Sequence, residues 1–120
     1  MRLTEESGLR AVKLRLGHPG LQDDIAAVEA VLDVLPAGTG LMVDYNQALP
    51  PDEALRRGAA LDGYGLLWIE EPMRHDDYEG QARLAEALRT PLQTGENFNG
   101  PEAMATALAL RACDCAMPDV

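Results

Sequence analysis

The sequence lacks the marks of several large protein classes. Its 120 residues contain 10 Lys and Arg against 20 Asp and Glu, a formal net charge of −10. No cluster of basic residues is present, which argues against a nucleic-acid partner, because phosphates need such a cluster. No apolar run reaches the length of a membrane span, and the N-terminal MRLTEESG lacks the apolar core of a signal peptide. We therefore expect a cytoplasmic protein with no nucleic-acid or membrane partner.

Several catalytic and ligand-binding signatures are also missing. The sequence contains no G-x-S-x-G nucleophile motif and no glycine-rich phosphate loop. Cys113 and Cys115 are too close in sequence for good disulfide geometry, and a structural zinc site usually needs four ligands. We interpret both cysteines as small buried residues. His18 and His75 fall in loops after expected strands, where a histidine is commonly just exposed.

What the sequence does contain is an alternation of short apolar segments and helical patterns. Five segments are mostly apolar and end in polar residues: 9–17, 39–47, 64–72, 90–97 and 111–120. Such runs are typical of parallel strands covered on both faces. Helical periodicity lies between them, in segments 21–36, 50–63, 76–91 and 99–111. The alternation predicts an α/β fold of about five parallel strands and four helices. It suits a doubly wound sheet and a partial TIM-type (β/α) barrel equally well.

The first helical segment has an apolar stripe that should face the sheet. Asp23 and Asp24 lie off this stripe, which consists of Ile25, Val28, Val31, Leu32 and Leu35. The next two segments carry helix-start signals: prolines and acids at 50–53, and Asp76 or Asp77 as an N-cap.

Acidic residues recur at the ends of the expected strands. Asp44, Glu70 and Glu96 are spaced 26 residues apart, about one strand–helix unit. This spacing predicts that they lie at the same level on successive strands, at the face of a barrel where catalysis occurs. Three converging carboxylates need a cation, and oxygen ligands favour Mg²⁺, or Mn²⁺, over zinc. The alternative is that each acid caps a helix or faces water.

The first expected strand contributes two cations. Lys13 and Arg15 share one face, and the apolar residues between and around them take the other. In a barrel the two cations would project inward, near the acids, whereas at an antiparallel edge they would only face solvent. Asn46 shares the face of Asp44 and is a candidate ligand of metal or substrate.

Taken in order, the segments AVKLRLG, MVDYNQ, WIEEP, HDDYEG, GEN and MPD resemble the enolase superfamily, in particular the mandelate racemase group of the mandelate racemase and muconate lactonizing enzymes. The resemblance covers essentially the whole chain. It implies a (β/α)₇β barrel with an N-terminal capping domain. The implied chemistry is Mg²⁺-assisted removal of the proton α to the carboxylate of a hydroxy acid or sugar acid.

The resemblance also implies residue roles. Asp44, Glu70 and Glu96 match the metal ligands, and Lys13 matches a lysine that holds the substrate carboxylate. Asp119 matches an aspartate that orients a catalytic histidine on the next strand. Glu71, the second acid of EEP, is not assigned to the metal, and we expect a structural or supporting role for it.

Arg15 departs from the family pattern, because it stands where that pattern has a second lysine acting as a base. A guanidinium, with a pKa above about 12, is a poor base. Arg15 would instead anchor a carboxylate or stabilise the enediolate. A one-base reaction, such as dehydration of a sugar acid, tolerates this change better than racemisation or epimerisation does. The closeness of MVDYNQ and WIEEP to the racemase pattern favours racemisation instead, so the two activities stay nearly balanced.

The length bounds what the chain can do, since a complete barrel takes about 250 residues. We expect residues 1–120 to be a fragment of the C-terminal catalytic barrel domain, without the capping domain and the last strands, and inactive alone. The parent enzyme is expected to be a homo-oligomer. The alternative is a non-catalytic remnant, or a half-barrel that binds only a metal or a partner.

Overall fold

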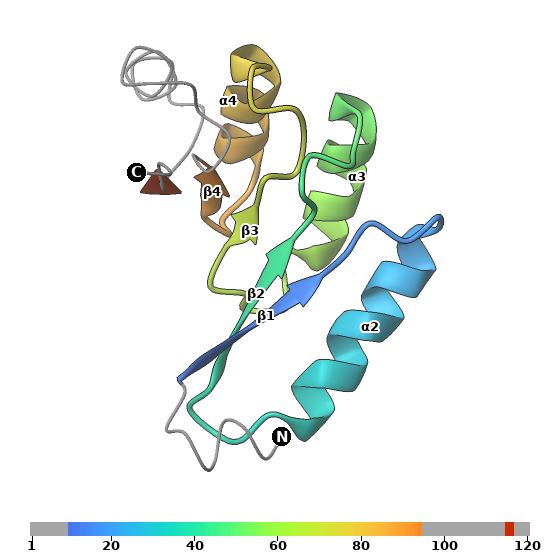
Figure 1. Ribbon diagram of the computed structural model, residues 1–120, viewed down its shortest axis with the longest axis vertical. Coiled ribbons are helices and arrows are strands. Elements are labelled where there is room, and N and C mark those ends of the chain that lie inside the picture. Colours follow the sequence, from blue (N-terminus) through green and yellow to red (C-terminus); the bar gives the residue numbers. More distant parts are fainter. Residues whose placement is uncertain (1–9, 95–114, 117–120) are drawn as a thin grey trace.

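The computed structural model describes residues 10–94 and the backbone of a short strand at 115–116 (Figure 1). Strands and helices alternate along the chain as predicted. No helix among these residues has both the length and the apolar character needed to cross a membrane. The fourth predicted helix, 99–111, lies outside the described residues. The elements are β1 (Ala11–Arg15), α2 (Leu21–Val34), β2 (Gly40–Asp44), α3 (Pro51–Leu61), β3 (Ile69–Glu70), α4 (Tyr78–Ala87), β4 (Leu92–Thr94) and β5 (Cys115–Ala116).

The order of the strands settles the choice between the two predicted architectures. The strands lie in the order β1-β2-β3-β4-β5, and every neighbouring pair is parallel. A doubly wound sheet reverses its strand order at a switch point, whereas a barrel adds each strand beside the previous one. Right-handed crossovers then place every helix on the same face. Consistent with this, α3 packs against both α2 and α4 (Figure 1). The topology is therefore that of a TIM-type barrel.

The register of the strands confirms the predicted alignment of the first two acids. Arg15 is level with Asp44, and Asp44 is level with Glu70. Glu70, however, is level with Gln93. Glu96 itself lies outside the described residues.

Strand β3 is shorter than the predicted segment 64–72. The chain takes positive φ at Gly65 (+70°) and at Glu71 (+45°), which an extended strand does not allow. Only Ile69 and Glu70 therefore form the regular ladder.

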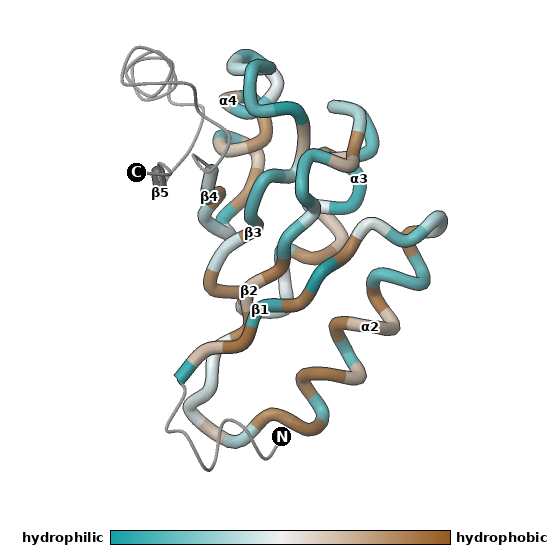
Figure 2. Tube along the Cα trace, viewed as in Figure 1, coloured by the Kyte–Doolittle hydropathy of each residue, from teal (hydrophilic) through white to brown (hydrophobic). Residues whose placement is uncertain are grey.

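The helices begin where the sequence signals them. Pro51 occupies the first turn of α3, followed by two acids, and Asp77 caps α4 by accepting a hydrogen bond from the Gly80 amide at 2.9 Å. Hydrophobic residues recur along α2, β1 and β2 (Figure 2). They bury a single core between sheet and helices, which includes Val28, Leu41, Val43, Leu61, Ile69, Leu84 and Leu92.

The apolar stripe of α2 packs on the sheet as predicted, with Val28 fully buried. Asp24 does not follow the pattern, because it lies off the stripe and yet is 0% exposed. Its burial is explained by polar partners from three other segments, described below.

Candidate metal and substrate site

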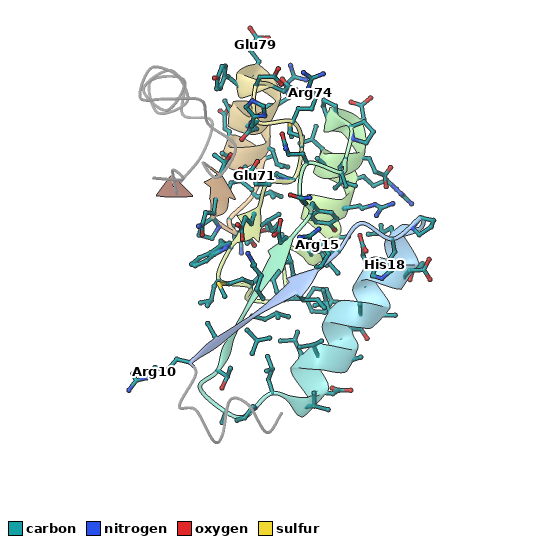
Figure 3. The ribbon with its side chains drawn as sticks, viewed as in Figure 1. Arg10, Arg15, His18, Glu71, Arg74 and Glu79 are labelled. Carbon is teal, nitrogen blue, oxygen red and sulfur yellow. The ribbon has the colours of Figure 1, made fainter. Side chains whose placement is uncertain are left out.

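The predicted two-faced character of β1 is confirmed. Leu16 is buried and Leu14 is partly buried against the core, while Lys13 and Arg15 are exposed on the opposite face. Figure 3 shows Arg15 at the end of β1. The alternation of a strand therefore directs both cations away from the helices.

Lys13 meets two of the predicted metal ligands. Its Nζ lies 3.1 Å from Glu70 Oε2 and 3.5 Å from Asp44 Oδ2. Arg15 Nη2 is 3.9 Å from Asp44 Oδ2, at the limit of an ion pair. The two carboxylates are buried, whereas the Lys13 side chain is 44% exposed. The sheet register thus brings together four of the predicted site residues.

The charges in this cluster stabilise one another. The hydrogen bond from Lys13 to Glu70 raises the pKa of Lys13, and the charges of Glu70 and Asp44 outweigh the opposing effect of burial. Lys13 is therefore an ammonium at neutral pH, suited to bind an anion.

Tight turns hold the ends of β2 and β3 beside each other. The Tyr45 amide donates to the Glu70 carbonyl at 3.0 Å, and the Asn46 amide donates to Asp44 Oδ1 at 2.8 Å. Asn46, Gln47 and Glu71 all have positive φ, between 45° and 66°. Non-glycine residues adopt this conformation at a cost, and such strain concentrates at functional sites.

Asn46 is placed differently from the expectation. The strand ends at Asp44, so the alternation that put both side chains on one face does not continue to residue 46. Asn46 is exposed and has a φ of +48°. Its observed link to the predicted metal ligand runs through its backbone amide.

The burial and the hydrogen bonds of Glu71 are consistent with the structural or supporting role expected for it. It is fully buried, and its Oε1 accepts a hydrogen bond from Thr94 Oγ1 at 3.1 Å, which joins the end of β3 to β4. Its amide donates to the Gln93 carbonyl at 2.9 Å, and its carbonyl accepts from the Gln47 amide at 2.7 Å.

The donor atoms of the cluster fit a divalent metal. Glu70 Oε1 is buried and has no hydrogen-bond partner within the described residues, an arrangement that is costly unless another group fills the position. Carboxylate oxygens at strand ends are the ligands that Mg²⁺ prefers. Among residues 10–94 no group of three or more His, Cys, Asp or Glu side chains is arranged to hold a metal. The third predicted ligand, Glu96, and the predicted catalytic residue Asp119 lie outside the described residues.

The polar network around Asp24 was not found from the sequence. Asp24 contacts His18, Tyr45 and Arg57, which come from the β1–α2 loop, the end of β2 and helix α3. The one signal in the sequence was a pair of acids at the start of a helix, and such acids usually interact with the helix dipole in solvent.

Comparison with known proteins identifies the family of this arrangement. The sequence profile described as "Enolase C-terminal domain-like" matches residues 1–120. The L-talarate/galactarate dehydratase of Salmonella typhimurium is 37% identical over 117 residues, which are 98% of this chain and 29% of that protein.

Solved structures show the same likeness. An enolase from Bradyrhizobium, complexed with magnesium and mandelic acid, is 41% identical, with a TM-score of 0.93 over 98% of this chain and 32% of that one. The L-talarate dehydratase of Polaromonas sp. JS666, complexed with Mg and L-glucarate, is 37% identical, with a TM-score of 0.94 over 98% of this chain and 33% of that one. This chain thus spans about a third of the length of these relatives. With the barrel topology and the clustered strand-end acids, these matches show that the chain belongs to the enolase C-terminal domain-like family of the mandelate racemase and muconate lactonizing enzymes.

Proposed function

We propose that this chain is the part of a barrel enzyme that binds a divalent metal and the carboxylate of a hydroxy acid or sugar acid, for removal of the proton α to that carboxylate. One observation carries the proposal. Lys13 lies between two buried carboxylates, Asp44 and Glu70, at the C-terminal ends of adjacent parallel strands, and a second buried oxygen of Glu70 has no partner within the described residues.

Asp44, Glu70 and Glu96 would hold the metal, which we propose to be Mg²⁺. Relatives crystallised with magnesium support this choice. When bound, such an ion stabilises the negative charge that develops on the substrate as the α proton leaves.

The cations of β1 would bind and orient the substrate. Lys13 stays protonated because Glu70 raises its pKa, so it would pair with the substrate carboxylate. Arg15 is 65% exposed beside Asp44 and is permanently charged, so it would anchor a second anionic group or stabilise the enediolate. Neither side chain is suited to accept the proton. Asp119 would serve by orienting a histidine that accepts it.

We favour acid-sugar dehydration over racemisation or epimerisation. Racemisation by two bases needs a proton acceptor on each side of the α carbon, and a guanidinium on the Arg15 side does not accept a proton. The names of two similar proteins, an L-talarate/galactarate dehydratase and an L-talarate dehydratase, agree with this choice. The competing proposal is a half-barrel that binds metal without catalysis, since the chain spans about a third of its relatives.

Calorimetric titration with MgCl₂ tests the metal site directly. We expect Glu70→Gln and Glu96→Gln to weaken Mg²⁺ binding at least tenfold, because each removes a charged oxygen ligand. Glu86→Gln is the matched control, since Glu86 is exposed on α4, and it should change the Kd less than twofold. Equal binding by all variants would refute the ligand assignment.

Incubation with Mg²⁺ and sugar acids in D₂O tests the chemistry. Deuterium at the α carbon, measured by NMR, would establish proton abstraction and exclude the non-catalytic half-barrel.

A further inference from the structure

Asp24 is fully buried, and its carboxylate accepts five hydrogen bonds. Its Oδ1 accepts from the Gly17 amide (3.2 Å), the His18 amide (3.0 Å) and His18 Nδ1 (2.7 Å). Its Oδ2 accepts from the Tyr45 hydroxyl (2.9 Å) and from Arg57 Nη1 (2.8 Å). Burial acts to raise the pKa of Asp24, but the bonds from His18, Tyr45 and Gly17 outweigh it and the pKa lies below its ordinary value. Asp24 is therefore an anion at neutral pH.

Arg57 supplies the countercharge and extends the network. It is almost fully buried in α3, and it donates to the His18 carbonyl at 2.7 Å and the Pro19 carbonyl at 3.1 Å. Its Nε donates to Glu53 Oε1 at 2.9 Å. The backbone of the β1–α2 loop, which runs between Arg15 and His18 in Figure 3, is thus held through both its amides and its carbonyls.

The network adjoins the proposed metal site at two points in the sequence. The β1–α2 loop begins at Leu16, whose amide donates to the Asp44 carbonyl at 2.9 Å. Tyr45 directly follows Asp44, its amide donates to the Glu70 carbonyl at 3.0 Å, and its hydroxyl ends on Asp24. Each of these two backbone hydrogen bonds therefore lies next to a group that Asp24 binds. The Leu16 bond precedes the Gly17 amide, and the Tyr45 bond belongs to the residue whose hydroxyl donates to Asp24.

We infer that Asp24 is a positioning residue of the metal and substrate site: through Tyr45 and the β1–α2 loop it holds the ends of β1 and β2 in register, so that Lys13, Asp44 and Glu70 converge. This inference rests on the proposed function for its purpose, but its structural content can be tested separately. A carboxylate with five donors from three segments serves well here, because each donor restrains a different piece of backbone.

Amide hydrogen exchange on the 120-residue chain tests the inference. Tyr45→Phe removes one hydroxyl bond to Asp24 and keeps the ring. We expect the amides of Leu16 and residue 45 to exchange at least tenfold faster in this variant. The Gly40 amide, which donates to the Arg10 carbonyl at the opposite end of the same strands, should change less than twofold.

Val28→Ala is the control for a loss of stability alone, because Val28 of α2 is fully buried in the core and its side chain has no polar atom that could join the hydrogen bonds of Asp24. It should raise the exchange of all three amides together. If Tyr45→Phe gave the same uniform rise, or no rise at Leu16 and residue 45, the positioning role would be overturned.

Titration with Mg²⁺ alone gives the second readout. We expect Tyr45→Phe to raise the Mg²⁺ Kd at least threefold and Val28→Ala to leave it unchanged. Binding by the unsubstituted chain with no difference between these variants would contradict the inference. A chain that bound no Mg²⁺ would instead count against the proposed function, and the exchange pattern would still decide the role of Asp24.

Discussion

Two buried acidic clusters lie at the ends of the first strands. They differ in how completely their carboxylate oxygens are hydrogen-bonded and in how deeply their cations are buried. In the Asp24 network both carboxylate oxygens of Asp24 have donors, and the countercharge of Arg57 is itself buried. In the Lys13–Asp44–Glu70 cluster the cation is 44% exposed, and one buried oxygen of Glu70 has no partner within the described residues.

This difference indicates a structural role for the Asp24 network and agrees with the ligand-binding role that we propose for the Lys13–Asp44–Glu70 cluster. A buried charge that is fully paired and hydrogen-bonded holds one arrangement, and removing a partner is costly. A buried carboxylate oxygen without a donor is costly, and the proposed metal would offset that cost at Glu70. Substitutions in the two clusters should therefore have different consequences for the folded state.

The largest effect is expected in the Asp24 network. Asp24→Asn would place an amide group against the donors of Arg57 and His18, and it would remove the only fully buried countercharge that the described residues give Arg57, which would keep just the partly exposed Glu53. We expect the free energy of unfolding to fall by about 3 kcal/mol, as for broken buried pairs, measured by urea denaturation. Asp33→Asn, on the exposed side of the same helix, should change it by less than about 0.5 kcal/mol. If Asp24→Asn lowered the free energy of unfolding by less than about 1 kcal/mol, the Asp24 network would be no more important for stability than the Glu70 cluster, and the comparison would fail.

A smaller effect is expected at the other cluster. Glu70→Gln keeps the size of the side chain, and Lys13 can return to water because it is already 44% exposed. We expect the free energy of unfolding to fall by about 1 kcal/mol, by the same denaturation measurement without metal. A loss as large as that of Asp24→Asn would show that Glu70 is principally structural.

The smallest effect is a pH dependence that belongs to Asp24. The folded-state pKa of Asp24 lies below its ordinary 3.8, so its stabilisation is present above pH 3.8 and is lost as the pH falls through the folded-state value. The difference in unfolding free energy between the unsubstituted chain and Asp24→Asn should therefore narrow below pH 3.8. Urea titrations at a series of pH values would show this, and a constant or widening difference would contradict it.

Much of the site could be predicted because it follows from local patterns. Alternation along β1 put Lys13 and Arg15 on one face, and the acids after two apolar runs predicted the approach of Asp44 to Glu70. The same patterns were less reliable where the chain turns. Asn46 lies beyond the end of β2, so the alternation along the strand does not place its side chain beside that of Asp44.

The network around Asp24 could not be predicted from the sequence. Its position in the helix predicted only that it stands off the apolar stripe, and solvent would satisfy it there. Its burial depends on Arg57, 33 positions later, and on Tyr45 at the end of another strand. No local pattern records that these three side chains meet.

The sequence by itself determined the alternation of strands and helices, the faces of β1 and the acids at strand ends, because side-chain periodicity is a property of neighbouring residues. Only the tertiary structure decided the sequential order of the sheet, the register that sets Asp44 level with Glu70, and the closed network around Asp24. These depend on how strands stagger and helices pack, and so on contacts between residues far apart in the chain.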